Sequence, residues 1–127
     1  MSIRVYTEEE LRLVYILHKV LSDMNPVEAI RYKASDGLEI EAVVTRPRLR
    51  AGQAKLPVIV LTHGGPYGVR DYAEYDQWAQ SIAEQGYVVI QPNYRGSGGY
   101  GTEFVKKGRQ DGFGTRMQDD LNDVIDH

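Results

Sequence analysis

The residues of this chain best suited to chemistry are two glycines that follow an apolar strand. The apolar run from Leu56 to Thr62 stops at the motif His63-Gly64-Gly65-Pro66. Glycines let a backbone turn sharply and approach a substrate, and enzymes of acyl transfer use backbone N–H groups at such turns to stabilise a developing oxyanion. The motif therefore predicts an oxyanion-binding turn, and the alternative is an ordinary turn between a strand and a loop.

Two other candidates for chemistry are weaker. His63 is interpreted as a hydrogen-bonded structural histidine, because no second histidine or carboxylate stands beside it at metal-ligand spacing. Ser97 lies in the glycine-rich stretch 96–101, but Arg95 occupies the place of the first glycine of a G-x-S-x-G nucleophile elbow. The same stretch matches G-x-G-x-x-G only formally, since residues 92–95 separate it from the preceding strand. We therefore expect neither a serine nucleophile at Ser97 nor a dinucleotide site.

A cluster of carboxylates close to the C-terminal end is interpreted as solvent-exposed surface. Helical spacing places Asp119, Asp123 and Asp126 roughly on one face and Asp120 to its side, which predicts a solvated acidic face rather than a metal site. The cluster consists of Asp119, Asp120, Asp123 and Asp126. The chain also lacks cysteine, so thiolate metal sites and thiol nucleophiles are excluded, and we expect neither a metal nor a cofactor.

Length and charge limit the class of protein. The 127 residues suffice for one domain with a real core but are few for an α/β enzyme. A formal net charge of −3 gives no electrostatic footprint for nucleic acid. No signal peptide or segment able to span a bilayer is recognised. We expect a cytoplasmic protein that binds neither nucleic acid nor membrane.

The N-terminal residues 1–25 are predicted to contain an amphipathic helix. Thr7 and Glu10 form a capping-box pattern at its start, and Asn25-Pro26 ends it. Its wide apolar stripe needs a cover, either the sheet or a second copy of the chain. The stripe consists of Leu13, Val14, Ile16, Leu17, Val20, Leu21 and Met24.

The remaining residues, 28–127, are predicted to form an α/β core. Alternating apolar residues indicate an antiparallel hairpin over 29–44, and apolar residues on both faces suggest a central parallel strand at Pro57 to Thr62. Later elements are a helix over 72–85, a strand over 87–90, a glycine-rich loop over 93–114 with a helical turn at 103–107, and a helix over 116–127. The 72–85 helix is expected to carry Tyr75, Trp78, Ala79 and Ile82 on one side. The last helix is expected to point Met117, Leu121, Val124 and Ile125 inward.

Several segments together resemble one enzyme family. They are YKASDGLEI, LPVIVLTHGGPYG, EQGYVVIQPNYRGSGGYG and MQDDLNDVID, within residues 31–126. In this order they resemble the start of the catalytic domain of serine peptidases of the prolyl oligopeptidase family, nearest its acylaminoacyl-peptidase branch. The resemblance implies a partial α/β-hydrolase fold with strand order 1-2-4-3, in which the strand Pro57 to Thr62 lies at an edge.

The resemblance also assigns roles to residues. Gly65 corresponds to the glycine whose backbone N–H supplies half of the oxyanion hole, while His63, Gly64 and Pro66 shape its turn. Asn93, Tyr94, Arg95, Gly96 and Ser97 resemble the loop that borders the catalytic cleft. The Ser-Asp-His triad of the family and its second oxyanion donor have no counterpart in these 127 residues.

The expected protein is therefore a truncated hydrolase domain, a fragment of a peptidase acting on peptides or acyl-peptides that is inactive alone. The alternative function is a non-catalytic oligomerising interaction module or a remnant. We expect a homo-oligomer, assembled through the edge strand Pro57 to Thr62 or the N-terminal helix, because an apolar edge invites association. A complementing C-terminal hydrolase segment is a further expected partner.

Overall fold

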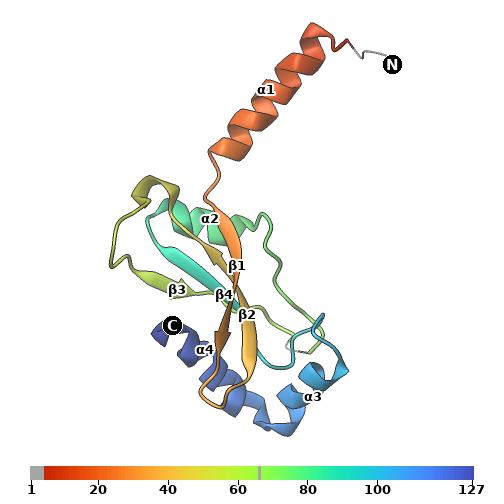
Figure 1. The fold of residues 1–127 in the computed structure, drawn as a ribbon, viewed down its shortest axis with the longest axis vertical. Helices are drawn as coiled ribbons and strands as arrows, with labels where there is room; N and C mark the ends of the chain where they lie inside the picture. Colours follow the sequence, from red (N-terminus) through yellow and green to blue (C-terminus); the bar gives the residue numbers. More distant parts are fainter. Residues whose placement is uncertain (1–4, 66) are drawn as a thin grey trace.

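A computed structural model of the chain describes residues 5–65 and 67–127 (Figure 1). Pro66, which the sequence assigns to the glycine turn, lies outside the described residues. The helices and strands are, in order, α1 (Glu8–Ser22), β1 (Val27–Lys33), β2 (Glu39–Thr45), β3 (Val58–Val60), α2 (Gln77–Glu84), β4 (Val88–Asn93), α3 (Thr102–Gln110) and α4 (Met117–Asp126). A short 3₁₀ turn, Arg48–Arg50, precedes β3, and an irregular helical turn, Gly112–Arg116, precedes α4.

The four strands form one mixed sheet in the order β1-β2-β4-β3. β1 and β2 make the predicted antiparallel hairpin, with Val27 opposite Thr45, and β2 continues antiparallel to β4. β3 pairs with β4 in parallel, with Val58 opposite Val88. The predicted hairpin and strand order are confirmed. The central position inferred from the apolar pattern of Pro57 to Thr62 is wrong, because β3 is short and lies at the edge.

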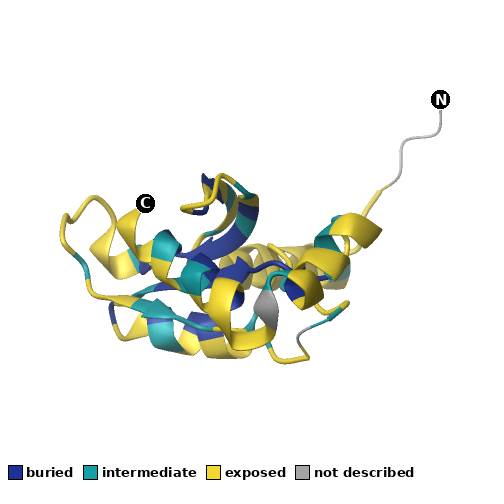
Figure 2. Ribbon diagram, turned by 90° about the horizontal axis from the view of Figure 1, so that it is seen from below, coloured by how far each residue is buried: buried dark blue, intermediate teal, exposed yellow. Residues whose placement is uncertain are grey.

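The apolar pattern of that strand instead reflects a helix on each face of the sheet. Leu61 packs against the cluster that contains Ala79 and Ala83 of α2, and Val60 packs against the cluster that contains Val124 of α4. The middle of the sheet is the buried part of the molecule (Figure 2). Because β3 and β4 are parallel, the loops that follow them, including the glycine turn, lie at the same end of the strands. This is where open α/β sheets place their ligands.

Helix α1 begins at the predicted residue, but the sheet does not cover its apolar stripe. Thr7 accepts a hydrogen bond from the Glu10 N–H, and the Glu10 carboxylate accepts one from the Thr7 N–H. The helix extends away from the sheet (Figure 1) and contains no buried residue. The sheet therefore does not cover the apolar stripe of α1.

Helix α2 is shorter than the predicted span 72–85. It begins at Gln77 because Asp76 adopts an extended backbone and its carboxylate accepts a hydrogen bond from the Ala79 N–H at 2.8 Å. Tyr75 and Trp78, expected on one side of the helix with Ala79, are 59% and 75% exposed. The small residues Ala79 and Ala83 make the contact with the sheet instead.

The C-terminal third differs from the prediction in two respects. The loop over 93–114 contains a full helix, α3, rather than one turn at 103–107. In α4, Met117 and Val124 are buried as predicted, but Ile125 is 62% exposed. Among residues 5–65 and 67–127, every helix is too short or too polar to cross a lipid bilayer.

Candidate functional site

The glycine turn after β3 has a geometry that requires glycine at one position. Gly65 has φ = +120°, in the region that side chains disfavour, and a Cβ there would lie 2.7 Å from Cγ2 of Val69. An added Cβ at Gly64 would meet no atom within 4 Å. Both glycines are exposed at the end of the strand. The backbone at Gly65 is therefore accessible to a ligand and held in a conformation that only glycine adopts readily.

His63 connects this turn to the loop that follows β4. Its Nδ1 lies 2.9 Å from the Gly64 carbonyl oxygen and its Nε2 lies 2.9 Å from Oγ of Ser97. The Ser97 hydroxyl donates its one proton to the Tyr94 carbonyl at 2.7 Å, so a hydrogen bond between Ser97 Oγ and His63 Nε2 forms when that ring nitrogen carries a proton. His63 thus links the glycine turn to the buried side chain of Ser97.

Tyr94 makes a second connection between the same two segments. Its hydroxyl donates to the His63 carbonyl at 2.8 Å, and its ring stacks on the imidazole with centroids 4.6 Å apart. Further along, Gly68 N–H donates to the Gly96 carbonyl and Gly98 N–H to the Val69 carbonyl. These contacts fix the position of the glycine turn relative to β4. A site held by such contacts is positioned more precisely than one on an unsupported loop.

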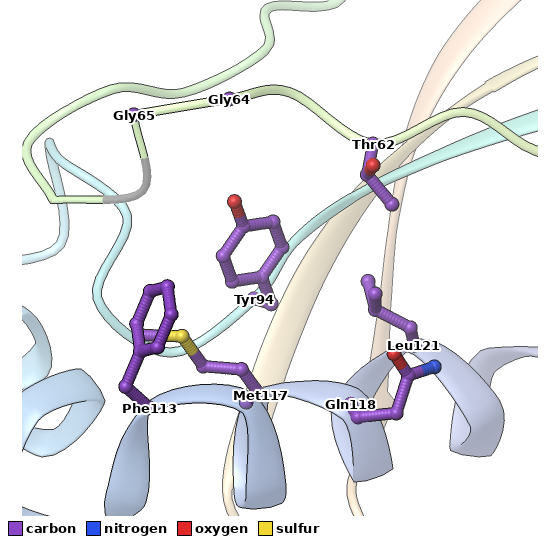
Figure 3. A pocket seen from close by; sticks show the side chains of 9 residues that line it. Thr62, Gly64, Gly65, Tyr94, Phe113, Met117, Gln118 and Leu121 are labelled. Carbon is purple, nitrogen blue, oxygen red and sulfur yellow. The ribbon is translucent and has the colours of Figure 1, made fainter.

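A cavity of about 290 Å³ opens between the glycine turn and the start of α4 (Figure 3). Gly64, Gly65 and Thr62 form one wall, and the Tyr94 ring lines the cavity between this wall and α4. The opposite wall consists of Phe113, Gly114, Met117, Gln118 and Leu121. The cavity is mostly apolar with a few polar groups, as in many small-molecule sites. It is large enough for a small side chain or an acyl group beside Gly65.

All five cleft-loop residues are buried, and they differ in whether they line the cavity. Asn93 is fully buried: its side-chain oxygen accepts from the Asp71 N–H at 2.7 Å, and its amide donates to the Asp71 carbonyl and the Tyr100 hydroxyl. Ser97 is also fully buried, and Gly96 packs closely against Gly108 of α3. Of the five residues, only Tyr94 lines the cavity.

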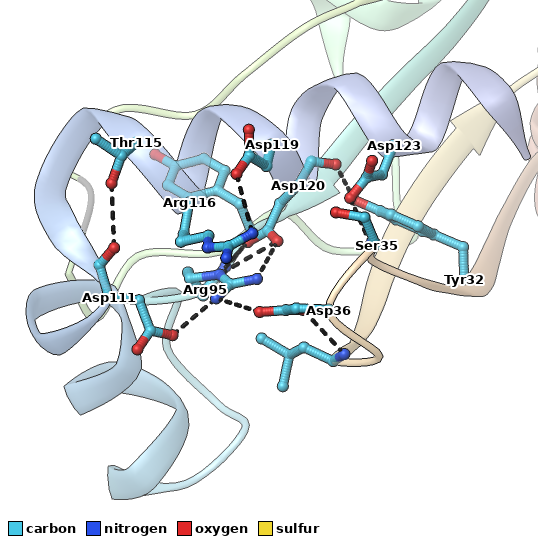
Figure 4. A network of polar contacts seen from close by, with 12 residues as sticks. Tyr32, Ser35, Asp36, Arg95, Asp111, Thr115, Arg116, Asp119, Asp120 and Asp123 are labelled. Atoms are coloured by element: carbon cyan, nitrogen blue, oxygen red, sulfur yellow. Dashed lines mark hydrogen bonds and ion pairs between the residues drawn. The ribbon is translucent and has the colours of Figure 1, made fainter.

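Arg95 is 1% exposed and joins four segments through ion pairs (Figure 4). Its guanidinium contacts Asp120 of α4 at 2.8 Å, Asp111 after α3 at 2.7 Å and Asp36 of the hairpin turn at 2.9 Å. Hydrogen bonds to these carboxylates raise the pKa of Arg95 above its ordinary value, and the contact with Arg95 lowers the pKa of Asp36. Arg95 therefore positions the loop and α4 rather than facing a substrate.

The carboxylates of α4 differ in how far they are buried. Asp120 is completely buried, because its carboxylate accepts hydrogen bonds from Arg95 Nε and from the Arg95 N–H. Asp123 accepts from the Ser35 N–H at 2.7 Å. Asp120, which helical spacing places to the side of the acidic face, is thus paired with a residue 25 positions earlier in the chain. In the described part of the chain, no three acidic, histidine or cysteine side chains converge as a metal site.

Sequence reasoning missed two groups near the site. Phe113, Met117, Gln118 and Leu121 form a cavity wall, although the helical pattern had assigned Met117 and Leu121 only to the core. Asp71 lies in a second hollow with His63 and Trp78, and its Oδ2 is buried with no hydrogen-bond partner. Burial raises the pKa of Asp71. No local sequence signal distinguishes either group.

Comparisons with known proteins agree on one family. The model of the prolyl oligopeptidase family matches residues 73–127. A peptidase of Bacillus subtilis, YuxL, is 35% identical over 99 residues, which cover 78% of this chain. The chain belongs to the prolyl oligopeptidase family. The human acylamino-acid-releasing enzyme is another relative of this family member, 29% identical over 68% of the chain.

The fold of this family member agrees with that of solved relatives. Acylaminoacyl peptidase of Pyrococcus horikoshii superposes with a TM-score of 0.68 and 31% identity over 88% of the chain. The four-stranded sheet and its flanking helices are thus a partial α/β-hydrolase fold. The chain spans only 15% of the length of the Bacillus protein, 11% of the human enzyme and 17% of the Pyrococcus chain.

Proposed function

We propose that this chain contributes part of the active site of a serine-type peptidase acting on peptides or acyl-peptides. The observation that carries the proposal is Gly65, exposed at φ = +120° beside the cavity of Figure 3. Its backbone N–H is proposed as one donor to the oxyanion of the tetrahedral intermediate. Family membership and the names of the relatives support peptide bonds as the substrate class.

The contacts around Gly65 suit this role. A donor to an oxyanion stabilises the transition state only if it is held in place before the reaction. The contact of His63 with Ser97 and the stacking of His63 on Tyr94 hold His63, two residues before Gly65, from two directions. The loss of one oxyanion donor typically lowers kcat by about 10²–10³-fold.

The nucleophile is proposed to come from residues outside these 127. Ser97 is fully buried and its hydroxyl donates to a backbone carbonyl, which leaves it neither accessible nor free to be activated. The 127 residues contain no G-x-S-x-G sequence. Since the loss of a triad member lowers the rate by about 10⁴-fold or more, we expect the chain alone to be inactive.

Covalent labelling with a fluorophosphonate probe tests this function. The 127-residue chain alone should remain unlabelled, and addition of a family segment that carries G-x-S-x-G should produce labelling on the added segment. Mass spectrometry locates the modified serine. Labelling of Ser97, or the failure of every such segment to give labelling in a complex shown to form, would overturn the proposal.

A second candidate function is a non-catalytic interaction module. The observation that favours it is α1, which has no buried residue although its apolar side chains cover much of its surface. Its large exposed apolar residues are Leu11, Leu13, Val14, Tyr15, Ile16, Leu17, Val20 and Leu21. A chain that associates but is never labelled in any complex would support this function instead.

A further inference from the structure

We propose that Arg70 is a positioning residue for the oxyanion donor at Gly65. Its side chain holds the segment 68–72 on the glycine-rich stretch 96–101, and that segment in turn supports the Gly65 turn. The inference deepens the proposed function and rests on it, because the position of the Gly65 N–H matters for catalysis only if that group meets an oxyanion. It also gives the glycine-rich stretch a role that its formal match to G-x-G-x-x-G does not supply.

The segment that follows the glycine turn lies directly on the stretch 96–101. Gly68 N–H donates to the Gly96 carbonyl at 3.1 Å. Two residues later in the stretch, Gly98 N–H donates to the Val69 carbonyl at 2.9 Å. A Cβ on Gly98 would lie 2.5 Å from the Gly68 carbonyl oxygen. Two backbones approach this closely only where no side chain separates them, so glycine at position 98 is required by the segment that it contacts.

Val69 connects the position of this segment to that of Gly65. A Cβ at Gly65 would lie 2.7 Å from Cγ2 of Val69, so the Val69 side chain lies against the backbone of Gly65. The same residue is held through its carbonyl by Gly98. A displacement of the segment would therefore remove the support of the Gly65 turn. A misplacement of about 1 Å by a residue outside the chemistry can lower a rate by about 10²-fold.

The Arg70 side chain fixes the segment to two other parts of the molecule. Its guanidinium carbon lies 4.6 Å from the ring centroid of Tyr100 and 4.7 Å from that of Tyr72. Its Nη2 donates to the Glu41 carboxylate of β2 at 2.7 Å. The side chains of this ion pair are only 20% and 16% exposed, so water screens them less than it screens a surface pair. Arg70 thus combines an ion pair with two cation–π contacts.

The groups that contact Arg70 are themselves held in place. The Tyr100 hydroxyl donates to Glu41 at 2.7 Å and accepts from the side-chain amide of Asn93 at 2.9 Å. Burial and the bond to Glu41 raise the pKa of Tyr100 above its ordinary value, so the hydroxyl keeps the proton that it donates. At Gly99 an added Cβ would lie 2.7 Å from Nη1 of Arg70. Glycine at this position leaves room for the guanidinium.

The mobility of the Gly65 amide in the chain alone provides the first test. NMR relaxation gives the order parameter of this N–H, which is about 0.85 for rigid backbone and below about 0.6 for flexible backbone. We expect a rigid Gly65 in the parent and a fall of about 0.2 or more in Arg70→Gln, which loses the ion pair and both cation–π contacts. Arg70→Lys keeps the charge and should restore part of the difference. A flexible Gly65 in the parent, or a Gly65 in Arg70→Gln as rigid as in the parent, would overturn the proposal.

Arg46→Gln is the matched control for the loss of one arginine. Arg46 pairs with Glu28 at 2.9 Å, and the two side chains are 55% and 53% exposed. The substitution removes the same charge as Arg70→Gln but no contact with the segment 68–72, so the order parameter of Gly65 should stay at the parent value. Circular dichroism checks that both variants fold. An equal loss of order in Arg46→Gln would contradict a specific role for Arg70.

Gly98→Ala tests the same path from the glycine-rich stretch. Its Cβ meets the Gly68 carbonyl, so it should displace the segment and loosen Gly65 as Arg70→Gln does. Gly101→Ala is the control, because its φ of +90° strains the backbone of the same loop while its Cβ meets no atom within 4 Å. It should lower the stability without loosening Gly65. Equal loosening by both alanines would show a general effect of stability and overturn the proposal.

Labelling by the fluorophosphonate probe relates this positioning to chemistry. In a complex with a family segment that carries G-x-S-x-G, and at concentrations where every variant is fully bound, Arg70→Gln and Gly98→Ala should slow labelling by about 10–100-fold. Arg70→Lys should slow it less, and Arg46→Gln should not slow it. Labelling of both variants at the parent rate would overturn the proposal. If the parent is never labelled in any complex, the proposed function fails, and the order parameters of Gly65 alone decide whether Arg70 positions the turn.

Discussion

His63 Nε2 and Ser97 Oγ lie 2.9 Å apart although 34 residues separate them in the sequence. The serine hydroxyl is completely buried and donates in turn to the Tyr94 carbonyl. A serine beside a histidine is often a nucleophile beside its base. Here the burial of Ser97 and the direction of its hydrogen bond make the pair a structural link that holds the turn containing Gly65.

Ser97→Ala should therefore destabilise the chain and leave its reaction with the fluorophosphonate probe unchanged. The substitution leaves His63 Nε2 and the Tyr94 carbonyl without this partner, and buried polar groups that lose a partner cost about 1–3 kcal/mol. We expect the free energy of unfolding in urea to fall by about 1–2 kcal/mol. Ser81→Ala, at an exposed position of α2, is the control and should change it little. Equal stability of Ser97→Ala and the parent would contradict the structural role.

Gly65→Ala should destabilise the glycine turn more than Gly64→Ala. At position 65 the added Cβ meets Val69 at 2.7 Å and the backbone has φ = +120°, whereas the Cβ at position 64 meets nothing within 4 Å. Strained backbone of this kind costs about 1–3 kcal/mol. Thermal unfolding should show a lower Tm for Gly65→Ala and a smaller change for Gly64→Ala. The reverse order would show that the turn has another conformation in solution.

Arg95→Lys should be strongly destabilising although the substitution keeps the positive charge. An ammonium cannot reach Asp36, Asp111 and Asp120 together in the planar geometry of a guanidinium. Breaking a buried ion pair while a carboxylate stays buried costs about 3–5 kcal/mol. Arg116→Lys, in an exposed pair with Asp119, is the matched control and should change stability by less than about 1 kcal/mol. Chemical denaturation of both variants tests the difference.

Local patterns in the sequence account for much of the fold. Thr7 and Glu10 predict the start of α1, and alternation predicts the β1–β2 hairpin, because both depend on neighbouring residues. The beginning of α2 is mispredicted because Asp76, in an extended conformation, caps the helix through its carboxylate, so that Tyr75 falls outside it. Helical spacing does not reveal such a late start when aromatic residues precede the cap.

The site was less accessible to sequence reasoning because its contacts join distant segments. The motif 63–66 identifies the turn, and the family resemblance points to Gly65. Nothing near Asp120 indicates that Arg95 buries it, and nothing near Ser97 indicates its bond to His63. Such pairings depend on where the sheet and α4 bring side chains together, which composition and spacing do not encode.

Asp71→Asn should stabilise the chain at neutral pH, and the effect should depend on pH in a defined direction. Burial raises the pKa of Asp71, and its Oδ2 has no hydrogen-bond partner, so ionisation is less favourable in the folded chain than in the unfolded one. The stability contributed by Asp71 is therefore fully present below its unfolded pKa of about 3.9 and is lost as pH rises through its folded pKa. The asparagine carries no charge and avoids this loss.

Thermal unfolding from pH 3 to pH 8 measures this effect. At pH 7 we expect a Tm a few degrees above that of the parent, and the difference should shrink as pH falls and Asp71 takes up its proton in both states. Asp126→Asn is the control for the removal of one negative charge, since Asp126 is exposed at the end of α4. If both variants gain equally at pH 7, the gain comes from the net charge of −3 rather than from the burial of Asp71. A gain at pH 3 that equals the gain at pH 7 would also contradict the assignment, because protonated aspartate and asparagine are both neutral there.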